Sequence, residues 1–118
     1  MSAAEELRQV LTADADLAAA VTAVRADLAI ESDAYPFIVF KRVGIEPMFG
    51  LDNSLHLTKE TFQVECWGEH RSQSSDVAEL AIAALIAAGM PPSPSDPDAI
   101  DPEIGARAVV LNVEIFDQ

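Results

Sequence analysis

The sequence predicts an α+β domain in which a small, mostly antiparallel β-sheet carries an N-terminal and a central helix on one face. Three observations predict this class: helical spacing of apolar residues near the N-terminus, period-2 alternation over residues 61–68, and an Ala/Leu-rich stretch at 76–88 before a final alternating segment. With 118 residues, 50% of them hydrophobic, the chain has room for one core. We therefore treat residues 1–118 as a single domain.

Charge and composition exclude several classes of protein. The formal net charge of -13, from 20 acidic and 7 basic residues, argues against a wide nucleic-acid footprint on a monomer. A single cysteine allows no internal disulfide and favours a reducing compartment. The apolar run at 80–90 is too short to span a bilayer, and the first residues lack the pattern of a signal peptide. We expect a soluble cytosolic protein without a membrane partner.

Two capping signals open the N-terminal helical region. Ser2 and Glu5 form a capping box, and Asp14 suits a second N-cap. Helical spacing predicts that the second stripe runs to Leu28, and it leaves open whether the two pieces are one bent helix or two. The apolar residues at this spacing are Leu7, Val10, Leu11, Leu17, Val21, Val24 and Leu28.

A strand is predicted over residues 37–43, opened by Pro36, and its expected antiparallel partner runs from about His56 to residue 68. The connection at residues 44–55 contains glycine, proline, aspartate and asparagine, so we expect a long loop there. Its apolar residues are Ile45, Met48, Phe49 and Leu51. Long loops with exposed apolar residues tend to be functional. Flexible loops are expected at about 44–56 and 90–105.

Residues 61–68 alternate so that Phe62, Val64 and Cys66 share the core face. The opposite face carries polar residues and then Trp67, the single tryptophan of the chain. A tryptophan on an outward face is a common anchor of a subunit contact. The alternative is that Trp67 lies beneath a helix or loop of its own chain, and this stretch does not decide between the two.

The second half is predicted to hold a helix, an acidic segment and a last strand. The helix begins at Asp76, or a turn earlier at Ser72, and ends at Gly89. Because it is apolar nearly all round, we expect it to be buried on more than one side. Residues 91–102 hold prolines and aspartates, which predict an extended, solvated segment without regular structure. Residues 107–116 alternate, with Val109, Leu111, Val113 and Ile115 on the inner face.

No arrangement of residues favours an enzyme, a cofactor or a metal. Residues of metal-ligand type occur at His56, Glu65, Cys66, Glu69 and His70, but Glu65 and Cys66 fall on opposite faces of the strand, the set lacks metal spacing, and Cys66 sits on the core face. The acidic tract at 96–103 lacks the ligand order of a calcium loop. The three cations that could meet across the hairpin more readily pair with carboxylates of the same or the next subunit. They are Lys41, Arg42 and Lys59.

Most of the chain resembles the tail completion proteins of long-tailed bacteriophages and prophages, also called tail terminator or tail-to-head joining proteins. The segments that carry the resemblance are residues 11–17 (LTADADL), 35–38 (YPFI), 62–68 (FQVECWG), the helix at 76–88 and the C-terminal strand. They are patterns of helix and strand rather than catalytic signatures. The chain departs from the family pattern in the proline- and aspartate-rich stretch at 91–102.

The resemblance implies a non-enzymatic assembly protein of the virion tail or neck, made in the bacterial cytoplasm. Similar proteins form a ring, typically hexameric, that caps the tail tube, ends its polymerisation and meets the head-tail connector, while DNA passes through without specific binding. Trp67 with Phe116 is then a candidate subunit contact. The candidate axial contact comprises Met48, Phe49, Leu51, Leu55 and His56. Another phage neck component and a small cytosolic α+β ligand-binding dimer are the alternatives.

Overall fold

The computed structural model describes residues 2–28, 34–52, 55–102 and 104–117. Three helices and a five-stranded, mostly antiparallel sheet confirm the predicted α+β class. In chain order the elements are α1 (Ala3–Ala13), α2 (Ala15–Ala20), β1 (Val24–Ala26), β2 (Phe37–Phe49), β3 (Leu55–Gly68), α3 (Arg71–Ala87), β4 (Ser93–Ile100) and β5 (Arg107–Asp117).

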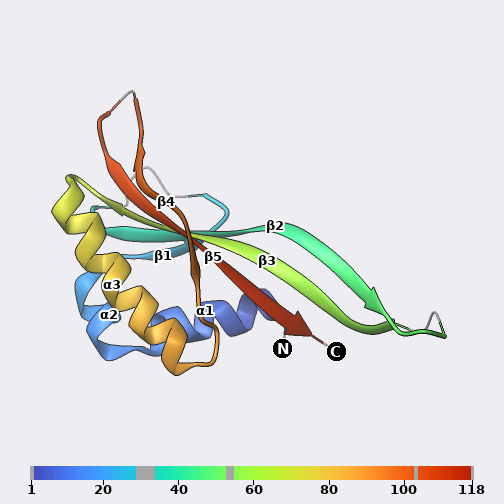
Figure 1. The fold of residues 1–118 in the computed structure, drawn as a ribbon. Coiled ribbons are helices and arrows are strands. Elements are labelled where there is room, and N and C mark those ends of the chain that lie inside the picture. The colour runs from blue at the N-terminus through green and yellow to red at the C-terminus, as the bar shows by residue number, and fades with distance from the viewer. Residues whose placement is uncertain (1, 29–33, 53–54, 103, 118) are drawn as a thin grey trace.

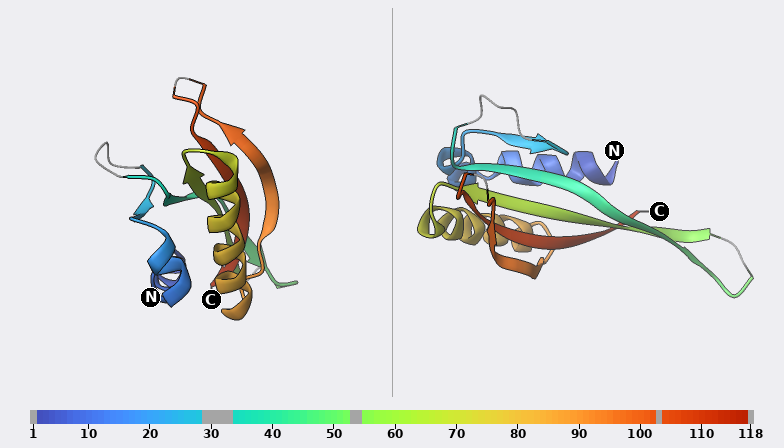
Figure 2. Two further views of the ribbon diagram at one scale, coloured as in Figure 1. Left: turned by 90° about the vertical axis from the view of Figure 1, so that its left-hand side faces the viewer. Right: turned by 90° about the horizontal axis from the view of Figure 1, so that it is seen from above.

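The sheet has the strand order β1-β2-β3-β5-β4, in which β1 runs parallel to β2 and the other neighbours are antiparallel. The helices lie on one face of the sheet, as predicted (Figures 1 and 2). Between helices and sheet lies a core in which Leu7, Leu11, Phe62, Val64 and Leu111 are buried. The opposite face carries none of the described helices, and we call it the open face.

The N-terminal region forms two helices that meet at Asp14. Ser2 Oγ accepts from the Glu5 backbone N–H at 3.2 Å, and Asp14 Oδ1 accepts from the Leu17 N–H at 2.9 Å, so both predicted N-caps are confirmed. Asp14 has extended dihedral angles, which end α1 and begin α2. The question of one helix or two is thus decided in favour of two.

The prediction that the second helix continues to Leu28 is wrong. α2 ends at Ala20, and the next residues turn to lie beside β2. Ile38 N–H donates to the Ala23 carbonyl at 3.0 Å, and Val24 stands in register with Ile38. The helical spacing of Val24 and Leu28 is therefore overridden by pairing with β2, and the β-branched Val24 itself favours a strand. Leu28 is exposed.

The central helix begins earlier than predicted. His70, rather than Ser72 or Asp76, is the N-cap, and its Nδ1 accepts from the Gln73 N–H at 3.3 Å. At the other end Gly89 takes a left-handed φ of 77°, as expected for a residue that follows a helix. α3 contacts β3, β5 and both N-terminal helices, so it is buried on more than one side, but it also exposes Ile86.

Two predicted loops are strands. Most of residues 44–56 belongs to β2 and β3, which form one long ribbon whose last pair is Phe49 with Leu55. Residues 93–100 form the edge strand β4, whose pairing with β5 shifts register twice. Pro47 and Pro97 each occur in a strand with one outer side, the position in a sheet that tolerates proline best. The predicted extended and exposed character of 91–102 holds.

Candidate assembly interface

The ribbon of β2 and β3 projects beyond the part of the sheet that the helices cover (Figure 1). β1 pairs with β2 only as far as Phe40, and β5 follows β3 only until Asp117 reaches Thr58. Beyond these points the two strands pair only with each other among the described strands. The molecule is accordingly elongated, with principal extents of 51 × 30 × 23 Å.

A β-bulge at the base of the ribbon decides which residues share a face. The register shifts between Arg42 and Gly44, so that Met48 stands opposite Leu57 and Glu46 opposite Lys59. Lys59 also stands opposite Phe116 of β5. Phe116 is therefore a diagonal neighbour of Leu57 on the open face, at roughly 7–8 Å.

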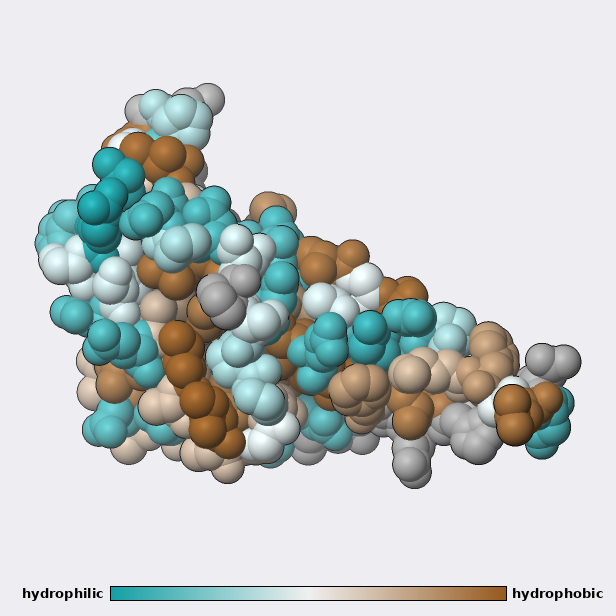
Figure 3. Space-filling view, viewed as in Figure 1, coloured by the Kyte–Doolittle hydropathy of each residue, from teal (hydrophilic) through white to brown (hydrophobic). Residues whose placement is uncertain are grey.

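We call Met48, Leu57 and Phe116 the ribbon patch. The side chains of Met48 and Phe116 are 41% and 56% exposed, and Leu57 is half-buried. At the ribbon's end Phe49 is 61% exposed and Leu51 fully so. Figure 3 shows hydrophobic side chains in patches along the ribbon and at its far end. Apolar area of this kind, with no core beneath it, is typical of a surface that meets a partner.

Ion pairs of Lys59 lie beside the ribbon patch. Lys59 Nζ lies 3.1 Å from Glu46 Oε2 and 4.0 Å from Glu114 Oε1. The hydrogen bond that Lys59 donates to Glu46 and the charges of both carboxylates raise the pKa of Lys59 above its ordinary value. These three residues form a charged band across the open face, which runs beside Met48 and Leu57 and is level with Phe116.

The other two cations of the hairpin are also paired within the chain. Lys41 Nζ lies 3.2 Å from Glu65 Oε2, and Arg42 Nη1 lies 2.8 Å from Glu60 Oε1. This confirms the expected pairing with carboxylates and removes the idea of an uncompensated basic spot at the hairpin.

Trp67 lies on the open face at the far end of the sheet from the ribbon. Its half-buried indole donates from Nε1 to Glu65 Oε1 at 3.1 Å, and it stands opposite Phe37, on which Tyr35 stacks at 5.1 Å. With Leu28 and other neighbours these side chains line a shallow hollow of about 270 Å³. Trp67 is thus packed partly by its own chain and partly open to a partner.

The structure does not bring Trp67 and Phe116 together. Phe116 is level with Lys59, eight residues along β3 from Trp67, which corresponds to about 26 Å at ~3.3 Å per residue. A single patch made of both residues is therefore excluded, and Phe116 lies instead with Met48. Leu55 and His56 open β3, but their side chains lie outside the described residues. The sequence analysis did not single out Leu57. If the alternation of residues 61–68 is continued towards the N-terminus, Leu57 falls on the same face as Trp67.

No chemical site competes with this surface in the part of the chain that the structure describes. Cys66 is fully buried, and burial raises the pKa of its thiol to about 12, which suits an inert core residue. The described residues hold no group of three or more histidine, cysteine, aspartate or glutamate side chains that suits a metal. None of the helices in the described ranges has the length and hydropathy needed to cross a membrane.

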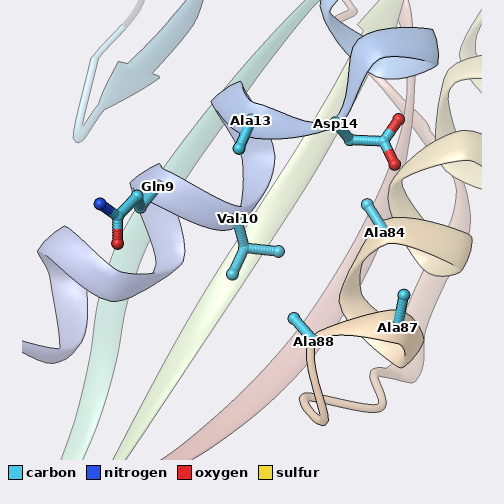
Figure 4. Close-up of a pocket in the computed structure, with 7 residues that line it drawn as sticks. All are labelled: Gln9, Val10, Ala13, Asp14, Ala84, Ala87 and Ala88. Carbon is cyan, nitrogen blue, oxygen red and sulfur yellow. The ribbon is translucent and has the colours of Figure 1, made fainter.

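A hollow of about 440 Å³ forms an open groove between α1 and α3 (Figure 4). Val10 of α1 faces the alanines of α3 across it, and Gln9 and Asp14 lie at its rim. Its lining supplies neither a nucleophile nor a pair of groups for acid-base chemistry.

Residues 5–116 match the model of a protein family described as tail completion protein gp17. The chain belongs to this family. No curated protein matches it in sequence. Among solved structures, one described as the structure of bacteriophage SPP1 gp17 protein shares the fold, with a TM-score of 0.52 at 16% identity over 95% of this chain and 87% of that chain.

Membership of the gp17 family confirms the resemblance found in the sequence and gives the chain a structural role in completing a bacteriophage tail. It implies a place in the virion tail or neck and contacts with other tail or head components. It also favours a role without catalysis.

Proposed function

We propose that this tail completion protein assembles into a ring, hexameric by analogy with the proteins it resembles, that caps the tail tube. The ring ends polymerisation of the tube protein and offers the surface that meets the head-tail connector. Assembly takes place in the bacterial cytoplasm, and DNA passes through the ring in the finished virion.

The observation that carries this proposal is the projecting ribbon. An isolated two-stranded hairpin is at best marginally stable in water, and exposed apolar side chains add to that cost. Phe49 and Leu51 at its end, with Met48 in the ribbon patch, gain most from burial against a neighbouring protein. We assign the ribbon, including Leu55 and His56 at the start of β3, to the axial contact with the tube.

Trp67 and Phe116 serve separate contacts in this proposal, because about 26 Å of sheet lies between them. Phe116 belongs with the ribbon patch and the axial partner. Trp67, whose indole is only half-buried, belongs to the body of the subunit, where neighbours in a ring meet. A large aromatic ring at such a place supplies much of the contact area of an interface.

The charge of -13 suits a ring around DNA. A lumen lined by carboxylates repels phosphates, so DNA slides through without being held. Since the described hairpin cations are paired with carboxylates of their own chain, they offer DNA little attraction.

Light scattering over a concentration series, with negative-stain images of the same samples, tests the ring. Purified protein is then incubated with tubes assembled from the tube protein of the same phage. We expect rings of about six subunits and tubes that stop elongating once capped. A tight dimer that leaves tube growth unchanged contradicts the proposal and favours the ligand-binding alternative, whereas rings that fail to stop growth favour another neck component.

Ribbon variants test the axial contact. Phe49→Ser with Leu51→Ser, or deletion of residues 48–51, is expected to leave a folded protein that no longer stops tube growth, so that overlong or headless tails accumulate. Ile86→Ser on α3 is the matched control, because Ile86 is similarly exposed but lies in the helical layer. Normal virions from the ribbon variants would remove the ribbon from the proposed mechanism.

A further inference from the structure

The ribbon that projects from the sheet exposes apolar side chains on both of its faces. Met48 of the ribbon patch lies on the open face and is 41% exposed. Ile45 lies on the other face, the helix-side face, because it stands opposite Glu60, which in turn stands opposite the core residue Ile115. Alternation along β2 places Pro47 on the helix-side face as well. Ile45 is 59% exposed and Pro47 is also exposed, because the described helices do not extend under this part of the ribbon (Figure 1).

The ribbon is also poor in charge. Among residues 43–58 the charged ones are Glu46 and Asp52, whereas 23% of the whole chain is charged. Glu46 is paired with Lys59 at 3.1 Å, and Asp52 lies in the connection at the ribbon's end. Charged residues are depleted in the core of protein interfaces, because a buried charge without a partner costs free energy. The composition of the ribbon therefore suits a segment that a partner encloses.

The faces of the ribbon are better suited to a partner than the outer edge of β2. That edge has a bulge between Arg42 and Gly44 and a proline at residue 47, and both features hinder pairing with a further strand. A partner is therefore met through side chains. A ribbon lying flat on a surface would bury one face and leave the apolar side chains of the other in water, where they gain nothing.

We infer that the ribbon inserts between two subunits at the end of the tail tube, so that tube protein covers both of its faces. This inference rests on the proposed axial contact and specifies its geometry. A tube built from repeated subunits offers a seam wherever two subunits meet at its end. From Gly44 to Phe49 the ribbon is about 20 Å long at ~3.3 Å per residue, which is enough for several side chains of each face to be enclosed. Packing on both faces supplies the support that an isolated two-stranded ribbon lacks.

Labelling of introduced thiols tests the inference. Native Cys66 is fully buried and its pKa is raised to about 12, so it should react slowly and leave the introduced thiol as the reactive one. Ile45→Cys reports on the helix-side face and Met48→Cys on the open face. Ile104→Cys is the matched control, because Ile104 is 67% exposed and lies outside the ribbon, between β4 and β5.

The labelling rate of each variant is measured on the free protein, on its rings, and on rings bound to tubes. With tube ends about tenfold above the Kd, the unbound fraction falls to about a tenth, so labelling at residues 45 and 48 should slow about tenfold. Labelling at residue 104 should keep its rate when tubes are added to rings. Unassembled tube protein should not protect both faces, because it lacks the seam.

Polar variants of similar shape give an independent measurement. Ile45→Thr and Met48→Gln each place a polar group without a partner in the enclosed site, which weakens binding. Each should raise the concentration that halves tube elongation by about tenfold or more, since a tenfold change needs only about 1.4 kcal/mol. Neither should change ring formation, and Ile104→Thr is the control. Circular dichroism verifies that every variant is folded.

The outcomes separate this inference from the proposed function. If tubes protect only one of residues 45 and 48, the ribbon lies flat, which contradicts insertion and leaves the terminator role standing. Protection of residue 45 by ring formation alone means that a neighbouring copy covers the helix-side face, and it contradicts the inference too. Protection of both residues by unassembled tube protein contradicts the seam. Wild-type rings that never stop tube growth contradict the proposed function and this inference together.

Discussion

Gly68 sits where β3 ends and the chain turns into α3, and a side chain there has no room. A Cβ at residue 68 would lie 2.7 Å from the Ser74 backbone nitrogen and 3.0 Å from Gln73 Cβ. The first of these contacts is with backbone, which a rotamer change cannot relieve. Gly68→Ala therefore forces the sheet and the start of α3 apart, and overpacking of this kind costs about 1–3 kcal/mol.

The expected shift in melting temperature follows from the chain length. At ~2.1 cal/mol/K per residue, 118 residues give an unfolding entropy of about 250 cal/mol/K, so 1 kcal/mol corresponds to about 4 °C. Gly68→Ala should thus lower the melting temperature by about 4–12 °C. Trp67 is the single tryptophan and precedes the altered residue, so its fluorescence should shift even in the folded variant.

Gly44→Ala is the matched control. A Cβ at residue 44 would meet Thr61 Cβ at 3.7 Å, an ordinary contact, and its backbone needs no left-handed φ. It should leave stability unchanged or raise it by up to about 1 kcal/mol, because alanine restricts the unfolded chain. Urea unfolding followed by Trp67 fluorescence measures both variants. If Gly68→Ala unfolds at the wild-type midpoint, the close approach of β3 to α3 is refuted.

Three further predictions concern the helices, the core thiol and the ribbon. Asp14→Ala should cost about 0.5–2 kcal/mol in urea unfolding through loss of the cap to Leu17, with Asp16→Ala as a milder control. The pKa of Cys66 is raised from 9.0 to about 12 in the folded state, which holds the proton more tightly, so this stabilisation is full below pH 9 and is lost as pH rises towards 12. Cys66→Ala should remove that slope from the stability profile. Phe49→Ser with Leu51→Ser should change stability by less than about 0.5 kcal/mol, as the two side chains have no core to leave, and a larger loss would mean that the ribbon packs on the body in solution.

The parts of the fold that the sequence predicts are those where a local rule and the tertiary contact agree. Alternation in β3 follows from a sheet with one covered face, and Phe62, Val64 and Cys66 are buried accordingly. The caps at Ser2 and Asp14 need only a side-chain oxygen and a nearby backbone N–H. Neither depends on residues distant in the chain.

The parts that could not be predicted depend on partners distant in the chain. Residues 24–26 form the strand β1 because they pair with β2, although the spacing of the apolar residues in this region also fits a helix. From the sequence alone Pro47 and Pro97 predict loops, but each lies in a strand that has no neighbouring strand on one side. The bulge after Arg42 is invisible in the sequence, yet it decides that Met48 lies on the open face with Phe116 and not on the face that the helices cover.

The ribbon explains why the sequence indicated a functional segment and misjudged its structure. Glycine, proline and polar residues between 44 and 55 resemble a loop because no core lies beneath them, and apolar residues there resemble an interface for the same reason. Backbone hydrogen bonds to β3 make the segment a strand without covering its side chains. The apolar side chains then face solvent in the single chain, and only another protein can bury them. In the proposed mechanism the tail tube is that protein, since a chain of this family contacts other components when a tail is completed.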